Sequence, residues 1–281
     1  MSSKTDRIRS LLQSKFENEL FDSSLHSLND KSNRLRYHNF CYSIRELSRH
    51  FLYSLSPEEK VYNCHWFKAQ TENGKPTRAQ RIKFAIQGGI YDTTLKSLNF
   101  DLDEQLEVIT KIKKIIDSLS KYTHINPENF KLTNQEIDKN SQQVLDTFVL
   151  FIETINIYRE QLKSYLDTII EDDMLGAIVS NFYQNIDRLA PHFSLDEAEV
   201  ESYHVQEISD YEVVVAVSGT IYVTLEYGSR KDRREGDGLD LNESFPYNTL
   251  IRYQIAEDFP NESYEVDSFD ADTSSWYDIE H

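Results

Sequence analysis

The spacing of the apolar residues changes once along this chain, near residue 195, and that change limits the folds it can adopt. Before it, apolar residues recur every three or four positions, as on one face of an α-helix. Two such stripes are formed by Leu106, Ile109, Ile112, Ile115, Ile116 and Leu119, and by Val144, Phe148, Phe151, Ile155, Tyr158, Leu162, Tyr165 and Ile169. After Pro191 the stretches "YEVVVAVSGTIYVTLEYG", "YNTLIRYQIAED" and "ESYEVDSF" are rich in β-branched and aromatic residues. The pattern predicts an α+β protein, with an all-helical domain over residues 1–193 and a small antiparallel β domain over residues 194–281.

Local start and stop signals support the helical interpretation of the first part. The stretches "SPEE", "TRAQ" and "TNQE" each place a hydroxyl residue, namely Ser56, Thr77 or Thr133, three positions before Glu or Gln. Such a pair can satisfy the free backbone N–H groups at a helix start. Gly88-Gly89 is expected to end the helix that begins after Thr77.

The charge of the chain is strongly uneven. The net charge is −18, but residues 1–100 hold 16 Lys and Arg against 10 Asp and Glu (+6), whereas residues 101–281 hold 14 against 38 (−24). A basic first third is compatible with a site for a polyanion such as RNA or another nucleic acid, beside an acidic remainder that repels non-specific binding. The alternative is that the acidic part only confers solubility.

Several classes of protein are disfavoured by what the sequence lacks. No stretch approaches the ~20 apolar residues that span a bilayer, and "MSSKTDRIRS" has no signal-peptide core, so we expect a cytoplasmic protein with no membrane partner. Cys41 and Cys64 belong to no CxxC pair or Cys/His cluster, and both are expected to be buried thiols.

The stretch "CYSIRELSRHFLYSL" contains an Arg and a His five positions apart, Arg45 and His50. Five residues turn an ideal helix by about 500°, so these two side chains point about 140° apart, whereas Glu46 and His50 share a face. One interpretation is an ordinary helix edge, with a buried stripe of Ile44, Leu47, Phe51 and Leu55. The other is a catalytic pair.

Arg-x4-His on a basic, all-helical domain resembles the HEPN ribonucleases. That resemblance implies RNA cleavage without a metal cofactor, in which His50 transfers a proton and Arg45 holds the phosphate as charge develops. It also implies a homodimer, because a two-fold axis would bring Arg45 of one chain to His50 of the other. Glu46 departs from the family pattern, which more often has Asn, Asp or His after the Arg.

A second resemblance covers more of the chain. It rests on "NFCYSIRELSRHFLYSLSPEE", "KPTRAQRIKFAIQGG", "KYTHINPENF", "VAVSGTIYVTLEYGSRKDRREGDG" with "SFPY", and "DTSSWYD". Together these stretches resemble the predicted nucleases encoded beside prokaryotic PIWI-like proteins. The resemblance implies a role in antiviral defence, with a protein of the defence system as a possible partner.

Other polar residues are candidates for the same site. "TRAQRIK" places Arg78, Arg81 and Lys83 in the first turns of a helix, where cations and free N–H groups favour a phosphate. The remaining candidates for nucleic-acid binding are Arg49 and Trp66, whose indole could stack on a base. His124, after Lys121 and Tyr122 in "KYTH", is a further candidate catalytic residue. Solvated helix faces and a core Trp are the alternatives.

A rival site lies in the loop "YGSRKDRREGDGLDLNESFP". Asp232, Asp237, Asp240 and Glu243 could supply oxygen ligands to Mg²⁺ for a metal-dependent nuclease. Their spacing matches no calcium-loop pattern, and Gly-Asp-Gly is common in turns. Three functions therefore stay open: metal-independent RNA cleavage, Mg²⁺-dependent cleavage, and a non-catalytic adaptor for a defence protein.

Overall fold

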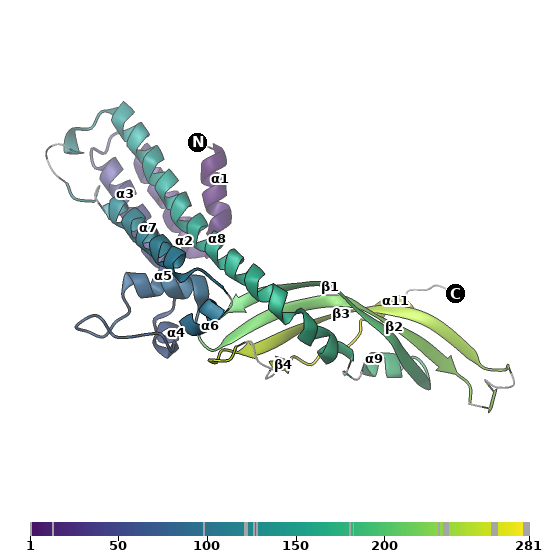
Figure 1. Cartoon of the computed structure of the whole chain (residues 1–281). Helices are drawn as coiled ribbons and strands as arrows, with labels where there is room; N and C mark the ends of the chain where they lie inside the picture. Colours follow the sequence, from purple (N-terminus) through teal and green to yellow (C-terminus); the bar gives the residue numbers. More distant parts are fainter. Residues whose placement is uncertain are drawn as a thin grey trace. The chain divides into compact units, whose positions relative to one another are not determined.

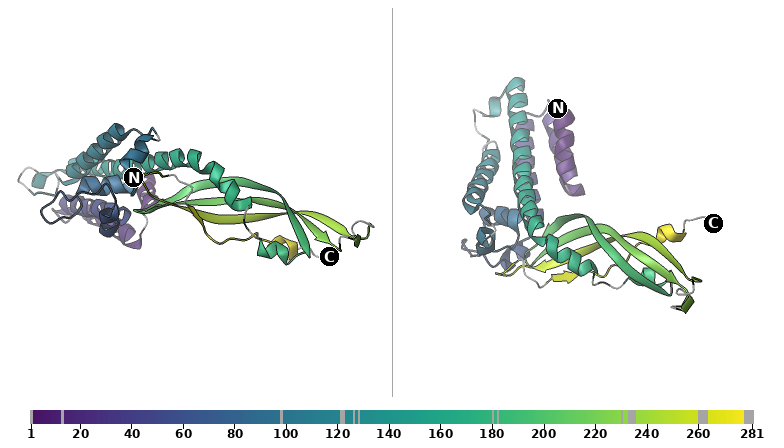
Figure 2. Two further views of the ribbon diagram at one scale, coloured as in Figure 1. Left: turned by 60° about the horizontal axis from the view of Figure 1, so that its bottom comes forward. Right: turned by 45° about the vertical axis from the view of Figure 1, so that its right-hand side comes forward.

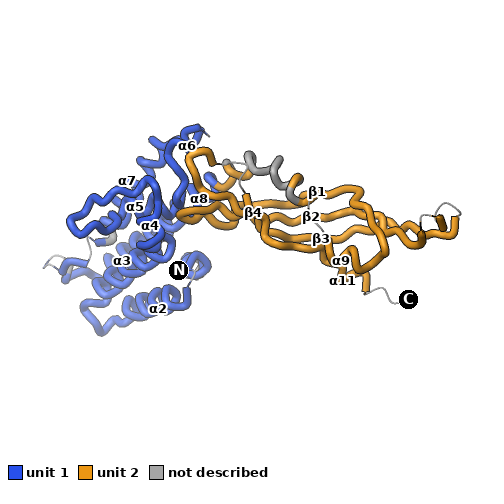
Figure 3. The backbone as a smooth tube through the Cα atoms, turned by 90° about the horizontal axis from the view of Figure 1, so that it is seen from below, with its two compact units in different colours: residues 1–162 blue, residues 163–281 orange. Residues whose placement is uncertain are grey.

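The computed structural model describes residues 2–12, 14–97, 99–120, 123–125, 127, 129–179, 181, 183–229, 231–232, 236–259 and 264–277. It divides into two compact units, residues 1–162 and residues 163–281 (Figure 3). Helices form the first unit and an antiparallel sheet dominates the second, which confirms the α+β class. Within the described residues, no helix combines the length and apolar character that a membrane crossing requires.

The first unit is a helical bundle (Figure 1). Its elements are α1 (Ser2–Leu11), α2 (Lys15–Asn29), α3 (Arg36–Leu55), α4 (Glu58–Asn63), α5 (Arg78–Gln87), α6 (Asp92–Ser97), α7 (Leu102–Ser120), a short 3₁₀ helix η1 (Asn129–Lys131) and the first part of α8 (Asn134–Val179). Phe51, Phe148 and Phe151 of the predicted stripes are fully buried in the core, together with Phe21 and Phe40, whereas Leu106 of the predicted stripe is 63 % exposed. Cys41 and Cys64 are both free and buried, as expected.

The helix starts agree with the sequence at two of the three predicted caps. Thr77 and Gln80 form a complete capping box on α5, and Thr133 accepts the backbone N–H of Glu136 at the start of α8. The prediction for Ser56 is wrong. Its hydroxyl donates backwards to the carbonyl of Leu52 at 2.5 Å, and Pro57 occupies the cap position of α4 without a side-chain bond.

The second unit contains the last part of α8, α9 (Gln184–Asp187), the four strands and α11 (Ser274–Tyr277). The strands β1 (His192–Ile208), β2 (Glu212–Tyr227), β3 (Leu239–Gln254) and β4 (Tyr264–Val266) form an antiparallel sheet in the order β1-β2-β3-β4. The three long strands twist together (Figure 2). The carboxylate of Asp167 in α8 accepts the N–H of Val205 at 3.2 Å, which ties helix to sheet inside this unit.

The predicted domains, residues 1–193 and 194–281, are divided where the helical pattern changes to a strand pattern. In the structure β1 begins close to that point, at His192. The compact units divide earlier, inside α8, because residues 163–179 of this helix belong with the sheet. The helix-to-strand change and the division into compact units are therefore different boundaries.

One glycine is required by the pairing of the first three strands. The hydroxyl of Tyr247 in β3 reaches beneath β2 and donates to the carbonyl of Glu199 in β1 at 3.1 Å. A Cβ atom at Gly219 in β2 would lie 1.9 Å from that carbonyl oxygen and 2.7 Å from the Tyr247 hydroxyl. Only a residue without a side chain leaves room for this hydrogen bond.

Strand β1 is the edge of the sheet and is irregular. Its register with β2 shifts at three places, between Leu195 and Glu197, Val200 and Ser202, and Val205 and Glu207. Its exposed side chains include a row of carboxylates, namely Asp196, Glu197, Glu199, Glu201 and Glu207. Both β-bulges and charged side chains hinder another chain from pairing with a free strand edge.

Candidate nucleic-acid site in the helical unit

The Arg-x4-His stretch lies in the middle of α3 and presents three faces. Ile44, Leu47 and Phe51 are fully buried in the core, which confirms the predicted apolar stripe at these positions. Arg45 is half-buried and lines a pocket. His50 is half-buried on another side, where its ring meets that of Phe16 from α2 edge-on at 4.9 Å. Within one chain the helix therefore directs the Arg45 and His50 side chains apart.

The pocket that Arg45 lines lies between three helices and has a volume of about 260 Å³. Its walls are Arg45, Glu46, Ser48, Arg49, Leu52 and Tyr53 of α3, Arg78 of α5 and Ile116 of α7. Three arginines thus line one small concave site, in which Glu46 is the only acidic lining residue. Arg45 makes no hydrogen bond or ion pair with any residue that the structure describes, so its charge is free for a ligand.

Arg49 links this pocket to His50. Its Nε donates to Glu46 Oε2 at 2.9 Å, its guanidinium lies 5.5 Å from the ring centre of Tyr53, and its Nη2 lies 3.4 Å from His50 Nε2. If Arg49 is the donor in that last contact, the imidazole is neutral and carries its proton on Nδ1. An anion held by Arg49 would accordingly lie beside a histidine nitrogen.

Arg78 is the third cation of the pocket. Its Nη1 forms an ion pair with Asp117 Oδ1 of α7 at 2.5 Å, and both side chains are substantially exposed. An exposed pair of this kind contributes little to folding. Asp117 occupies one side of Arg78 and would compete with a phosphate for it.

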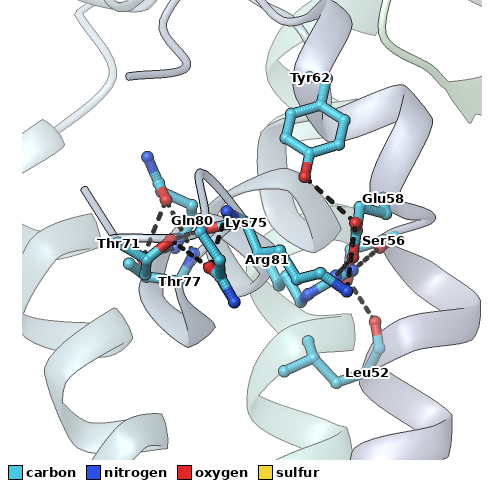
Figure 4. Close-up of polar contacts among 10 residues, drawn as sticks. Leu52, Ser56, Glu58, Tyr62, Thr71, Lys75, Thr77, Gln80 and Arg81 are labelled. Atoms are coloured by element: carbon cyan, nitrogen blue, oxygen red, sulfur yellow. Dashed lines mark hydrogen bonds and ion pairs between the residues drawn. The ribbon is translucent and has the colours of Figure 1, made fainter. Parts of the chain in front are cut away.

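Arg81 is buried, with 3 % of its surface exposed, and its guanidinium is bound by the protein itself. Nη1 donates to the carbonyl of Ser56 at 2.6 Å, and Nη2 donates to Glu58 Oε2 at 2.8 Å (Figure 4). The ring of Tyr53 lies over the guanidinium, 4.0 Å from centroid to Cζ. These contacts favour a structural role for Arg81 over the phosphate-binding role suggested by the sequence.

Lys83 and Trp66 also have partners in the fold. Lys83 Nζ lies 2.7 Å from Asp92 Oδ2 and 4.8 Å from the centre of the Trp66 ring. The indole N–H of Trp66 donates to the carbonyl of Gly88 at 2.9 Å. This arrangement ties the loop after α4 to the end of α5, and neither residue lines the arginine pocket.

His124 lies exposed in the turn after α7 and is not among the residues that line the pocket. Lys121 and Tyr122, its expected neighbours, lie outside the described residues. The structure therefore does not bring His124 together with Arg45 and His50.

The acidic loop between β2 and β3 shows turn geometry in its described part. Asp232 accepts the N–H of Ser229 at 2.9 Å, and the N–H of Asp237 donates to the carbonyl of Asp232 at 2.9 Å. The hydroxyl of Ser229, followed by its N–H, lowers the pKa of Asp232. Asp240 and Glu243 lie farther on, within β3. Over the described part of the chain, no three His, Cys, Asp or Glu residues are grouped so as to hold a metal ion.

Two features of the site escaped the sequence interpretation. One is Tyr53, whose ring contacts both Arg49 and Arg81. The other is Asp117, whose exposed carboxylate pairs with Arg78 through the packing of α7 against α5. The spacing of Arg49 and Tyr53, four residues apart on one helix, could have indicated the first contact.

Two family models cover nearly all of the chain. A model described as "Predicted pPIWI-associating nuclease" matches residues 9–148, and a second model with the same description matches residues 155–277. The first match ends and the second begins inside α8, the helix in which the chain also divides into its two compact units. No curated protein and no solved structure gave a significant match, and the resemblance to HEPN ribonucleases stays a prediction. The chain belongs to the family of predicted pPIWI-associating nucleases.

Proposed function

We propose that this protein is a cytoplasmic endoribonuclease of prokaryotic antiviral defence, which cleaves RNA without a metal and binds the scissile phosphate in the arginine pocket. The observation that carries the proposal is the pocket itself. Arg45, Arg49 and Arg78 line one small cavity, and Arg45 has no partner among the described residues. Guanidinium groups are well suited to phosphate oxygens, because their planar fork can donate two parallel hydrogen bonds.

The proposed reaction needs Arg49 as well as Arg45 and His50, because Arg45 and His50 point apart on α3 and Arg49 lies between the pocket and His50. His50 Nε2 accepts the proton of the ribose 2′-hydroxyl, whose oxygen attacks phosphorus while the bond from phosphorus to the 5′-oxygen breaks. The same proton then passes from His50 to the leaving 5′-oxygen, giving a 2′,3′-cyclic phosphate and a 5′-hydroxyl. Arg45 and Arg49 stabilise the charge that develops on the phosphoryl oxygens. The contact at 3.4 Å between Arg49 Nη2 and His50 Nε2 supports this assignment, because a phosphate held by Arg49 would lie near the imidazole.

The test is RNA cleavage in the presence of EDTA, with a 2′-deoxy substrate of the same sequence beside it. We expect cleavage of the RNA alone, because the deoxy strand lacks the attacking hydroxyl. His50→Ala should lower the rate by roughly 10²–10⁴-fold, and Arg45→Lys should also be impaired because an ammonium lacks the fork.

Matched controls exist in the same unit. His26 of α2 and Arg34, which precedes α3, are both exposed, so His26→Ala and Arg34→Lys should cleave as the wild type does. Cleavage that requires Mg²⁺, or full activity of His50→Ala with an unchanged melting temperature, would refute the proposed chemistry. In cells, His50→Ala should also lose protection against phage.

A second candidate function is supported by the family description, which names an association with pPIWI proteins. In that case the chain is a non-catalytic adaptor. It would bind the pPIWI protein tightly in a pull-down with purified components, while cleaving neither RNA nor DNA with or without Mg²⁺.

A further inference from the structure

A groove on the outer side of α7 and α8 is separate from the arginine pocket. The two helices run antiparallel, because the hydroxyl of Tyr158 in α8 donates to Glu104 near the start of α7, whereas Thr147 and Leu150 of α8 lie near Ile115. The groove has a volume of about 620 Å³ and is lined by Leu106, Glu107, Thr110, Lys111, Lys114 and Ile115 of α7 and by Thr147 and Leu150 of α8. It shares no residue with the arginine pocket.

Large apolar side chains are exposed along this groove. Leu106 is 63 % exposed and Leu150 is 43 % exposed, although both helices bury other apolar residues in the core. Two exposed leucines in one groove with charged side chains around them are compatible with a small protein interaction site. The groove therefore has the character of an interface whose other half is not supplied by the first unit itself.

The charges along α7 indicate which partner would fit. The first half of the helix carries Asp103, Glu104 and Glu107, and the second half carries Lys111, Lys113 and Lys114, together with Asp117, which is paired with Arg78 of α5. None of the three lysines forms an ion pair or hydrogen bond with a described residue. The acidic and basic halves lie on either side of Thr110, at the centre of the groove lining. A helix with this polarity is complementary to a copy of itself in the opposite direction.

We propose that the α7–α8 groove binds a second copy of this chain about a two-fold axis, with the two α7 helices antiparallel. In such an isologous contact the same patch meets itself, so Glu107 of one chain approaches Lys111 and Lys114 of the other. Leu106 and Leu150 of both chains become buried at the centre. A partner of uniform charge would meet repulsion from one half of α7, which is why the self-contact is favoured. The dimer does not depend on the proposed catalytic function, because Arg45 and His50 lie outside this surface.

The experiment is sedimentation equilibrium of the full chain over a concentration series, and we expect a concentration-dependent dimer. Leu106→Asp should weaken it. The double change Lys111→Glu with Lys114→Glu leaves only acidic charges among the residues that line the groove, and Asp103→Lys with Glu107→Lys leaves only basic ones there. Each doubly substituted protein should dimerise about 100-fold more weakly than the wild type, because like charges then oppose each other.

The decisive measurement is sedimentation of a mixture of the two charge-changed proteins. Acidic and basic faces attract, so an equimolar mixture should form a heterodimer at concentrations where each protein alone is monomeric. Lys31→Glu with Lys96→Glu, at exposed positions elsewhere in the first unit, should dimerise as the wild type does. A monomeric wild type, a dimer that is insensitive to the α7 changes, or a mixture that stays monomeric would each overturn the proposal. Circular dichroism establishes that every variant is folded.

Discussion

Replacing Arg81 by Leu tests whether this residue serves folding or nucleic-acid binding. The substitution removes two charge-assisted hydrogen bonds, to Ser56 at 2.6 Å and to Glu58 at 2.8 Å, and the contact with the Tyr53 ring at 4.0 Å. Loss of one partner from a buried ion pair costs about 3–5 kcal/mol. Because the side chain of Glu58 is 36 % exposed and can regain water, we expect a loss near the lower limit, about 3 kcal/mol.

The assay is urea unfolding of the full chain, followed by far-UV circular dichroism and by tryptophan fluorescence. Of the two tryptophans, Trp66 lies in the same unit as Arg81 and reports on its unfolding, whereas Trp276 lies in the other unit. The matched control is Arg78→Leu, one helical turn earlier on α5. Since Arg78 is 41 % exposed and its pair with Asp117 is at the surface, the free energy of unfolding should change by no more than about 1 kcal/mol, while RNA binding weakens. If Arg81→Leu unfolded at the wild-type midpoint but no longer bound RNA, the structural role assigned to Arg81 would be wrong.

Three further predictions concern other parts of the molecule. Asp117→Asn should strengthen RNA binding in a filter-binding titration, because it frees Arg78 from a competing carboxylate; unchanged or weaker binding would contradict this. Gly219→Ala should lower the melting temperature of the sheet unit, since the new methyl group would lie 1.9 Å from a carbonyl oxygen, and a wild-type melting curve would disprove the clash. Arg252 donates two hydrogen bonds to Asp267 and lowers the pKa of that carboxyl, so the pair stabilises the fold above the unfolded-state pKa of about 3.9 and loses this effect as the pH falls through the lower folded-state pKa. Asp267→Asn should therefore reduce stability at neutral pH and reduce it less in acid, as measured by unfolding at a series of pH values.

Local chemistry made much of the fold predictable. The apolar periodicity identified the helices and strands, Thr77 and Thr133 marked helix starts, and Gly88 ends α5 with a positive φ of 60°. Ser56 fits the same sequence pattern, but its hydroxyl donates to the carbonyl of Leu52 in α3. A serine between two helices can hydrogen-bond either to the end of the first helix or to the start of the second. Periodicity identified the long helix but not the division of α8 between two compact units, since that depends on what each half packs against.

The candidate site was predictable only in part. The helical rotation correctly indicated that Arg45 and His50 point apart on α3. The sequence suggested Arg81 and Lys83 as phosphate ligands, because it shows which residues are charged but not which side chains are buried. Their carboxylate partners, Glu58 and Asp92, come from other helices and could not be assigned from spacing. The convergence of Arg45, Arg49 and Arg78 likewise depends on the packing of α3 against α5.

The acidic, bulged edge strand β1 has a consequence for how the protein behaves at high concentration. Two molecules that approach through this edge bring rows of carboxylates together, so the barrier to intermolecular strand addition is electrostatic as well as steric. Electrostatic repulsion between surfaces falls off over about 10 Å at 0.1 M salt and disappears when the carboxylates are protonated. The resistance to fibre growth along β1 therefore has two components. The electrostatic component depends on pH and ionic strength, whereas the steric component, which comes from the irregular register, persists in acid and in salt.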